Sequence, residues 1–292
     1  MKIFDCFQFF DEDMMLDLRL NILDRYVDKF VIVENLFMHS GKKKKQVFNI
    51  NNYKKFQSKI KYILIDKLPE GLQDVTVKPN KSSNPVINNT LLIEHNQRNS
   101  ILKGLNDASQ NDLILISDVD EIPNLERFNY KLNKKLIFFK QQMYYYKFNL
   151  KYGNKEWIGT KGCLKKDLIS PQWLRDIKGR SYPFWRLDIL FSKMKYNSIE
   201  YVENGGWHFT NLRTAEELKK KLENFGHNAE FLESGLNVND ITKMMENNLA
   251  VYDYEADMKG NKWSGKPLIK TDTKELPQYI LLNKEKYTDW FS

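Results

Sequence analysis

The sequence predicts an α/β protein whose central sheet is mostly parallel, is flanked by helices and includes a small antiparallel part. Two observations support this fold class. Short apolar runs alternate with helical patterns through residues 1–120, and that order implies parallel strands joined by right-handed crossovers. After Pro123, aromatic runs that favour β-structure precede further helical patterns, which indicates an antiparallel part and a C-terminal helical region.

Three short apolar runs are expected to be the first strands: residues 3–10, 30–33 and 61–65. Between the first two, apolar side chains recur at offsets of four, seven and eleven from Leu16 to Val27. This spacing is typical of one face of an α-helix. The sequence therefore predicts an amphipathic helix between the first two strands.

A loop rich in Pro, Asn, Ser and Gly is expected next, over residues 69–89, followed by a helix from about 91 to 108. Residues 112–117 are expected to form a fourth, buried strand. Two aromatic runs, 136–140 and 143–148, favour antiparallel strands.

The C-terminal part is expected to be helical. Thr214 and Glu217 have the spacing of a capping box, which opens a helix. A second helix is expected over residues 239–249, and near the C-terminus only residues 277–282 resemble packed structure.

The formal net charge of +8 and the pI near 9.1 raise nucleic-acid binding as one alternative function. Most of the charge is lysine scattered among asparagines, and no segment resembles a nucleic-acid module, so we expect no nucleic-acid partner. The densest basic cluster runs from Lys42 to Lys45 in an apparent loop. It is either solvated or makes a peripheral contact with an anionic membrane or polymer.

Nothing in the sequence predicts export or membrane insertion. No run approaches the roughly 18 to 20 apolar residues of a membrane-spanning helix, and the N-terminal segment is acidic where a signal peptide needs basic residues. The two cysteines, Cys6 and Cys163, are expected to be core residues, with a disulfide between them as the alternative. We therefore expect a soluble, cytoplasmic protein.

Three carboxylates, Asp118, Asp120 and Glu121, directly follow the predicted strand 112–117, and Pro123 prevents its simple continuation. Ligand sites of open α/β sheets lie outside the carboxyl ends of the strands. Carboxylate oxygens suit Mg²⁺ or Mn²⁺, which can bridge to substrate phosphates. A polar turn with solvated acids is the alternative interpretation.

A metal-dependent phosphohydrolase or nucleotidyltransferase could use the same carboxylates. Either would need a glycine-rich phosphate loop or a second cluster of metal ligands. The sequence shows neither.

Five segments, taken in order, resemble glycosyltransferase family 17, the family of the bisecting β-1,4-mannosyl-glycoprotein N-acetylglucosaminyltransferase. They are 4–11 (FDCFQFFD), 27–34 (VDKFVIVE), 94–98 (EHNQR), 116–123 (ISDVDEIP) and 205–209 (GGWHF). The resemblance implies a GT-A fold, a nucleotide-sugar donor (UDP-GlcNAc in the best-known members) and inversion at the anomeric carbon. The Golgi anchor of the animal enzymes is missing from this sequence, so we expect a glycan acceptor other than an N-glycan.

The resemblance also implies a domain organisation. A Rossmann-like GT-A catalytic domain is expected over residues 1–230, with a nucleotide-binding half at 1–123 and an acceptor half at 124–230. Residues 231–292 are expected to form a C-terminal helical extension packed on the same domain.

Within that family frame, Asp120 is expected to bind Mn²⁺ or Mg²⁺ directly. Asp118 would reach the donor's ribose, or the metal through a water. Glu121 would hold the loop or the sugar. Glu34, at the end of the second strand, would accept a hydrogen bond from uracil, or else cap the strand.

Arg98 is expected to face the donor and neutralise its diphosphate, although it could instead pair with Glu94 one helical turn earlier. His208 would complete the metal site or contact the diphosphate, since the adjacent glycines let the backbone approach a ligand. Trp207 would stack on a sugar or belong to the core.

Inverting transfer needs a general base for the acceptor hydroxyl. Asp188 is the first candidate, because its aromatic surroundings predict burial and a raised pKa. Glu203 is the second candidate. Arg186 could pair with either carboxylate, and His227 could lie near the acceptor.

Overall fold

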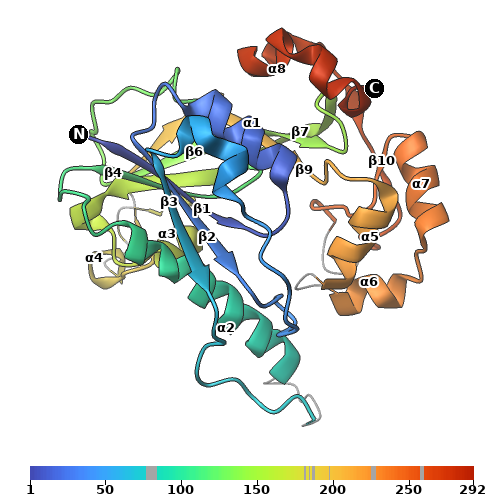
Figure 1. Cartoon of the computed structure of the whole chain (residues 1–292), viewed down its shortest axis with the longest axis horizontal. Helices are drawn as coiled ribbons and strands as arrows, with labels where there is room; N and C mark the ends of the chain where they lie inside the picture. Colours follow the sequence, from blue (N-terminus) through green and yellow to red (C-terminus); the bar gives the residue numbers. More distant parts are fainter. Residues whose placement is uncertain are drawn as a thin grey trace.

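The computed structural model shows a curved sheet with helices on both faces (Figure 1). It describes residues 1–76, 84–180, 182–183, 185, 188–196, 198–224, 228–256 and 260–292. Arg186 and His227 lie outside the described residues. No helix of the described part combines the length and the apolar character needed to cross a membrane.

The N-terminal half of the sheet is parallel. Its strands lie in the order β3 (Ile60–Ile65), β2 (Lys29–Asn35), β1 (Ile3–Phe9) and β4 (Leu113–Asp118). All four were predicted from apolar runs, and the α/β class with a largely parallel sheet is confirmed. Because Gln8 pairs with Asp118 and Phe9 with Glu34, the carboxyl ends of these strands meet at one edge.

The second half of the sheet is mixed. It continues from β4 through β7 (Leu150–Leu164), β6 (Leu136–Tyr145), β9 (Gly206–Thr210) and β5 (Glu121–Pro123). β7 is antiparallel to β4 and β6, whereas β9 is parallel to β6. β8 (Ile199–Val202) pairs with β6, and β12 (Ile269–Lys270) pairs with β7.

Two strand predictions need correction. The runs 136–140 and 143–148 are one strand, β6, in which the register with β7 shifts twice, and Tyr146 ends it with a positive φ of 64°. The antiparallel partner is β7, which was not predicted, because exposed polar residues and three glycines interrupt its apolar pattern. A Cβ on Gly162 would lie 2.8 Å from the Leu115 side chain, so that glycine permits close packing of β7 on β4.

Helix α1 (Asp13–Leu23) covers one face of the sheet, together with α8 (Gln278–Leu282) and the 3₁₀ helix η5 (Lys284–Trp290). The predicted leucine stripe of α1 is buried, and Ile280 and Tyr287 join the same core cluster. The C-terminal segment therefore packs against the first helix of the chain.

The opposite face is covered by α2 (Pro85–Asn99), the 3₁₀ helix η2 (Ser100–Gly104) and α3 (Pro171–Asp176). The prediction of a helix at 91–108 is wrong at both ends. Asn84 caps α2 by accepting hydrogen bonds from the backbone N–H groups of Val86 and Ile87, and Pro85 suits the first helical position. Cys6 and Cys163 are buried and free in this core, as predicted.

A third group of helices, α5 (Ala215–Asn224), α6 (Asn228–Ser234) and α7 (Val238–Glu246), gathers beyond β9 (Figure 1). Thr214 and Glu217 form the predicted capping box of α5. The remaining short elements are α4 (Asp188–Phe191), β10 (Leu249–Ala250), β11 (Lys266–Pro267), and the 3₁₀ helices η1 (Ile50–Phe56), η3 (Lys165–Asp167) and η4 (Thr273–Glu275).

Candidate functional site

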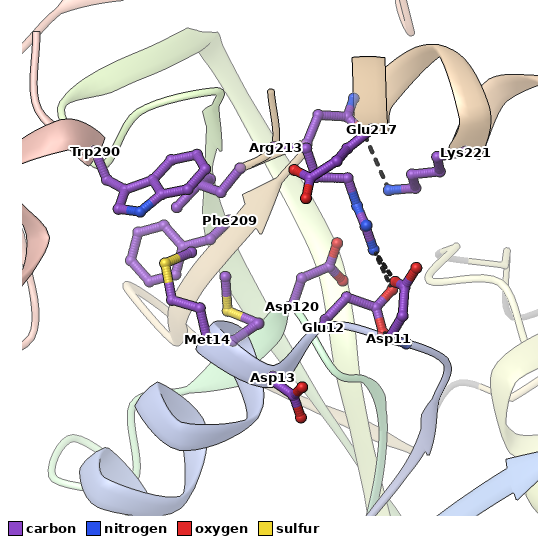
Figure 2. Close-up of a pocket in the computed structure, with 13 residues that line it drawn as sticks. Asp11, Glu12, Asp13, Met14, Asp120, Phe209, Arg213, Glu217, Lys221 and Trp290 are labelled. Atoms are coloured by element: carbon purple, nitrogen blue, oxygen red, sulfur yellow. Dashed lines mark hydrogen bonds and ion pairs between the residues drawn. The ribbon is translucent and has the colours of Figure 1, made fainter. Parts of the chain in front are cut away.

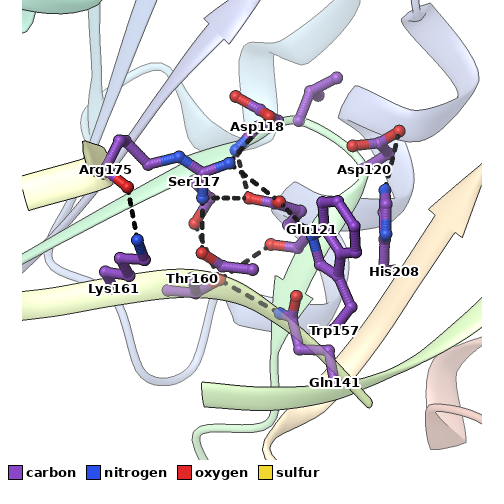
Figure 3. A network of polar contacts seen from close by, with 12 residues as sticks. Ser117, Asp118, Asp120, Glu121, Gln141, Trp157, Thr160, Lys161, Arg175 and His208 are labelled. Atoms are coloured by element: carbon purple, nitrogen blue, oxygen red, sulfur yellow. Dashed lines mark hydrogen bonds and ion pairs between the residues drawn. The ribbon is translucent and has the colours of Figure 1, made fainter. Parts of the chain in front are cut away.

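The acidic turn between β4 and β5 is fixed by the carboxylate of Glu121, which is buried (Figure 3). One oxygen accepts a hydrogen bond from Trp157 Nε1 at 2.7 Å, and the other accepts one from the Asp118 N–H at 2.8 Å. Arg175 donates to both oxygens. Of the two roles expected for Glu121, the structure therefore shows the one that holds the loop.

A second buried charge supports the same turn from the α1 side. Arg19 is fully buried and forms a bidentate ion pair with Asp5, at 2.6 and 2.7 Å. Its Nη1 also donates to the backbone carbonyls of Asp118, Val119 and Glu121, at 2.7 to 3.2 Å. Arg19 thus supplies hydrogen bonds to three backbone carbonyls of the turn.

The Asp118 carboxylate lies between two arginines from different helices. Arg98 of α2 donates to one oxygen at 3.1 Å, and Arg175 of α3 donates to the other at 3.0 Å. Loss of solvation would raise the pKa of Asp118, but Arg175 and Arg98 outweigh it and hold that pKa below its ordinary value. Asp118 therefore holds two guanidinium groups together, and its expected contact with the donor's ribose, or with the metal through a water, stays a prediction.

Arg98 makes one of the two contacts considered for it, the ion pair with Glu94, at 2.9 Å, and it also reaches Asp118. Its contact with the donor diphosphate stays a prediction. Its Nη1 donates to Gln172 at 2.6 Å, which ties α2 to α3. The imidazole of His39, after β2, lies in the same surroundings; burial lowers its pKa and favours the neutral form.

Glu34 does not fit its expected role of binding uracil. Its carboxylate is fully buried and accepts hydrogen bonds from Lys44, from the backbone N–H groups of Val47 and Phe48, and from the hydroxyl of Tyr62. Glu34 instead closes the loop that follows β2.

The same contact changes the interpretation of the basic cluster from Lys42 to Lys45. Lys44 points inward to Glu34, and its side chain is only 7% exposed, whereas the flanking lysines are exposed. The cluster is therefore not one uniform basic surface, and a membrane or polymer contact through it stays a prediction.

Asp120 faces the other side of the turn, toward β9. Its Oδ2 lies 3.6 Å from His208 Nε2, and the His208 ring packs against Trp157 with centroids 5.0 Å apart (Figure 3). Burial would raise the pKa of Asp120, but His208 outweighs it and lowers that pKa. Burial would lower the pKa of His208, but Asp120 raises it. The two side chains act as one pair.

The two glycines before Trp207 serve a packing role that differs from the expected approach to a ligand. Gly206 has a φ of +136°, and a Cβ there would lie 2.1 Å from the Ile122 carbonyl oxygen. The two glycines let β9 lie against β5. His208 and Glu121 then face each other in the register of the two strands. Trp207 points to the opposite face, where it packs on the core and its Nε1 donates to the Glu275 carbonyl at 2.7 Å. Stacking of Trp207 on a sugar is therefore not supported.

Asp120 and His208 fit a divalent cation that takes some of its ligands from the protein and the rest from a substrate. Within the described residues no three His, Cys, Asp or Glu side chains converge as a metal cluster. In the same part of the chain, His208 Nδ1 is buried and has no hydrogen-bond partner. A carboxylate and an imidazole form an acceptable partial donor set for Mn²⁺ when phosphate oxygens supply further ligands, whereas Mg²⁺ would take the carboxylate and phosphate oxygens.

The two expected general bases lie on the surface. The expected burial of Asp188 among aromatics is wrong, because its side chain is 44% exposed and pairs with Lys195. Glu203 is 61% exposed and lies 2.7 Å from Lys140 Nζ. Their roles as bases stay predictions, without the burial that motivated the first.

Sequence reasoning missed three residues that build the site: Arg19, Trp157 and Arg175. The only available signals were charged residues within apolar patterns, such as Asp5 in the first strand and Arg19 in the leucine-rich helix. A cavity beside Asp120 was also missed, since it is lined by residues from Asp11 to Trp290.

Comparison with known proteins identifies one family. The model of glycosyltransferase family 17 matches residues 1–170. Among solved structures, one similar chain is a Bacillus anthracis protein assigned as a glucose-1-phosphate thymidylyltransferase, in complex with sucrose. It is 12% identical, with 81% of this chain and 96% of that chain covered and a TM-score of 0.35. No curated protein matches.

Proposed function

Because the chain belongs to glycosyltransferase family 17, and is therefore a sugar transferase, we propose that it transfers a sugar from a UDP-sugar to a hydroxyl group of a glycan. GlcNAc is the proposed sugar and inversion the proposed stereochemistry. GlcNAc is proposed because the best-known members of the family, which the sequence resembles, use UDP-GlcNAc.

One observation carries the proposal: two guanidinium groups lie on one side of the acidic turn, at the carboxyl edge of the sheet, and a carboxylate–imidazole pair lies on the other. Arg98 and Arg175 converge on Asp118, while Asp120 faces His208 and an acid-lined cavity. The phosphates of a nucleotide diphosphate would take the place of carboxylate oxygens on these guanidinium groups. The sugar at its end would then lie near Asp120.

The topology supports a GT-A fold for the catalytic domain. Parallel strands β3-β2-β1-β4 would form the nucleotide-binding half, and the acidic turn follows β4 directly. Sites of open α/β sheets lie at this edge. The mixed strands β7, β6, β9 and β5 continue the sheet beyond the turn, where an acceptor half is expected.

The residues proposed to hold Mn²⁺ or Mg²⁺ are Asp120 and His208, together with donor phosphates. When bound, such a cation stabilises the negative charge that develops on the departing diphosphate. Asp118 would hold Arg98 and Arg175 beside the same phosphates, which would compete with it for their N–H groups, and Glu121 would keep the turn in place. The contacts of Glu121 exist before any ligand binds, so the turn itself needs little reorganisation.

The proposed transfer is a single displacement. The acceptor oxygen forms a bond to the anomeric carbon while the bond from that carbon to the β-phosphate oxygen breaks. UDP leaves with the electron pair, and the hydroxyl proton passes to a carboxylate base.

The direct test measures UDP release from UDP-GlcNAc, UDP-glucose and UDP-galactose, with Mn²⁺ or with EDTA, in the presence of glycan mixtures. We expect release with at least one donor, stimulated by a glycan and abolished by EDTA. Failure of every UDP-sugar to bind or turn over, with or without Mn²⁺, would falsify the proposal.

A further inference from the structure

A cavity of about 200 Å³ opens beside Asp120, on the side away from Asp118. Its walls come from the start of α1, the end of β9 with the following turn, helix α5, and the last residues of the chain (Figure 2). It is too large for a single water molecule and has direct access to Asp120.

The cavity is acidic. Five carboxylates line it but only two cationic side chains do: Asp11, Glu12, Asp13, Asp120 and Glu217, against Arg213 and Lys221. Arg213 is already paired with Asp11 at 2.6 Å and with Glu12 at 3.0 Å, and Lys221 donates to the side chain of Asn211 at 2.9 Å. An anion entering the cavity would meet an excess of negative charge.

The remaining wall is apolar. Figure 2 shows Trp290, Phe209 and Met14 on one side of the cavity, and the carboxylates of Asp11, Glu12 and Asp120 on the other. A flat aromatic surface opposite hydrogen-bond acceptors matches a sugar ring, which has apolar C–H faces and hydroxyl groups around its edge.

Trp290 is held in place by a contact of its own backbone and by contacts of Ser292, two residues later. Its backbone carbonyl accepts a hydrogen bond from the Phe148 N–H at 2.8 Å. Ser292 exchanges two hydrogen bonds with the Asn149 side chain, at 2.8 and 3.0 Å. The C-terminal segment is therefore anchored to the β6–β7 connection, and the indole is positioned before any ligand arrives.

We infer that this cavity is the acceptor site and that it takes an uncharged sugar, stacked on Trp290 with its hydroxyl groups toward the carboxylates. The inference rests on the proposed function, because it assigns the acceptor of that reaction. It follows that the carboxylates within reach of the acceptor hydroxyl are those of the cavity, such as Asp11 and Glu12, instead of Asp188 and Glu203.

The test is a ligand-observed NMR titration of the full chain with matched probes, without donor or metal. The methyl glycosides of glucose, galactose and mannose are compared with the methyl glycosides of the corresponding uronic acids, which carry a carboxylate at C6. We expect the best neutral glycoside to bind at least tenfold more tightly than its uronate. A uronate that binds as tightly as its neutral counterpart would refute the inference, as would a folded wild type that binds no neutral glycoside.

Variants locate the binding. Trp290→Ala should weaken the best neutral glycoside at least fivefold, while Trp290→Phe should retain most of the affinity. Glu217→Gln should reduce the discrimination against the uronate, whereas Glu126→Gln, an exposed carboxylate outside the cavity, should not. Unchanged affinity in a folded Trp290→Ala variant overturns the assignment.

UDP release, measured with water alone and with a glycan as the acceptor, separates the proposed transfer reaction from the proposed sugar site. Glycoside binding without any UDP release would overturn the transfer reaction but leave the sugar site standing. UDP release stimulated by a glycan, in a protein that binds no neutral glycoside, would support the transfer reaction but overturn the sugar site.

Discussion

Asp118 and Asp120 are separated by one residue, yet they face opposite surroundings. Asp118 lies between Arg98 and Arg175, whose remaining bonds tie α2, α3 and the turn together. Asp120 has one histidine nearby and borders an acid-lined cavity. The two carboxylates of an Asp-x-Asp pair are therefore not necessarily equivalent ligands, because the chemistry of each depends on the elements that it faces.

Each side also has a buried nitrogen without a hydrogen-bond partner among the described residues, Arg98 Nε on the Asp118 side and His208 Nδ1 on the Asp120 side, but the two sides differ in their networks. On the Asp118 side, Glu121, Arg175 and Arg19 form a buried network that sets the turn before any ligand binds. On the Asp120 side, His208 Nδ1 lacks a partner within the described residues. We expect the first side to govern the shape of the site and the second to carry its reaction.

The largest expected effect comes from separating the two aspartates. Asp120→Asn should lower kcat/KM for UDP release by about 10³-fold and remove its dependence on Mn²⁺, because the variant loses the carboxylate proposed to bind the cation. Asp118→Asn should lower the rate while keeping the response to Mn²⁺, because Asp118 positions arginines. Initial rates measured over a range of Mn²⁺ concentrations distinguish the variants.

Equal loss of the Mn²⁺ response in both variants would contradict the distinction between Asp118 and Asp120. The carboxylates would then act as equivalent ligands, and the pairing of Asp118 with two arginines would have no separate role.

The next effect is on stability. Arg175→Met should lower the free energy of unfolding by about 3 kcal/mol, since it leaves the buried Glu121 carboxylate and Asp118 without their shared cation. The control is Arg25→Met, whose partner Glu126 lies 3.4 Å away with both side chains exposed. It should cost less than about 0.5 kcal/mol. Urea unfolding measures both, and equal costs would show that the Asp118 network adds no rigidity.

The sequence predicted what depends on local patterns. The four parallel strands follow from apolar runs, and the acidic turn follows from carboxylates placed directly after the fourth run. The capping box of α5 was read from two residues three positions apart. Each of these features is set by neighbours in the chain.

Features that need distant partners were missed or misassigned. Arg175 reaches Asp118 and Glu121 across more than fifty positions of sequence, and Arg213 reaches Asp11 across 202. Glu34 seemed available to a ligand because nothing in the sequence indicates that Lys44 folds back onto it. The wall of the cavity formed by Trp290 could not be predicted, because the family resemblance ended near residue 230.

A smaller effect concerns pH and again tests the Asp118 side. Burial lowers the pKa of Lys161 from its ordinary value near 10.5 to about 7, and its amine donates to the carbonyls of Arg175 and Ile177. Between these pH values the unfolded chain binds one more proton than the folded one, so stability rises with pH. Relative to Lys161→Met, the wild type should gain about 1 kcal/mol between pH 7.5 and 8.5.

The Lys161 comparison is made by urea unfolding at both pH values. Other groups titrate in this range, but they are common to both proteins and cancel in the difference. If the difference in the free energy of unfolding between wild type and Lys161→Met does not change with pH, the Lys161 amine is not buried beside Arg175.

The smallest effect belongs to the Asp120 side. Thr214 Oγ1 accepts a hydrogen bond from the Glu217 N–H at 3.3 Å, and Glu217 accepts one from the Thr214 N–H at 3.0 Å, so the cap of α5 also orients a carboxylate of the cavity. Thr214→Ala should cost only about 0.5 kcal/mol of stability, because the cap is exposed and its bond is long. Thr214→Ser keeps the hydroxyl and is the matched control. If the cavity binds the acceptor, Thr214→Ala should raise the KM for the glycan more than the KM for the donor. An equal rise in both KM values would show that Glu217 has no specific role in acceptor binding.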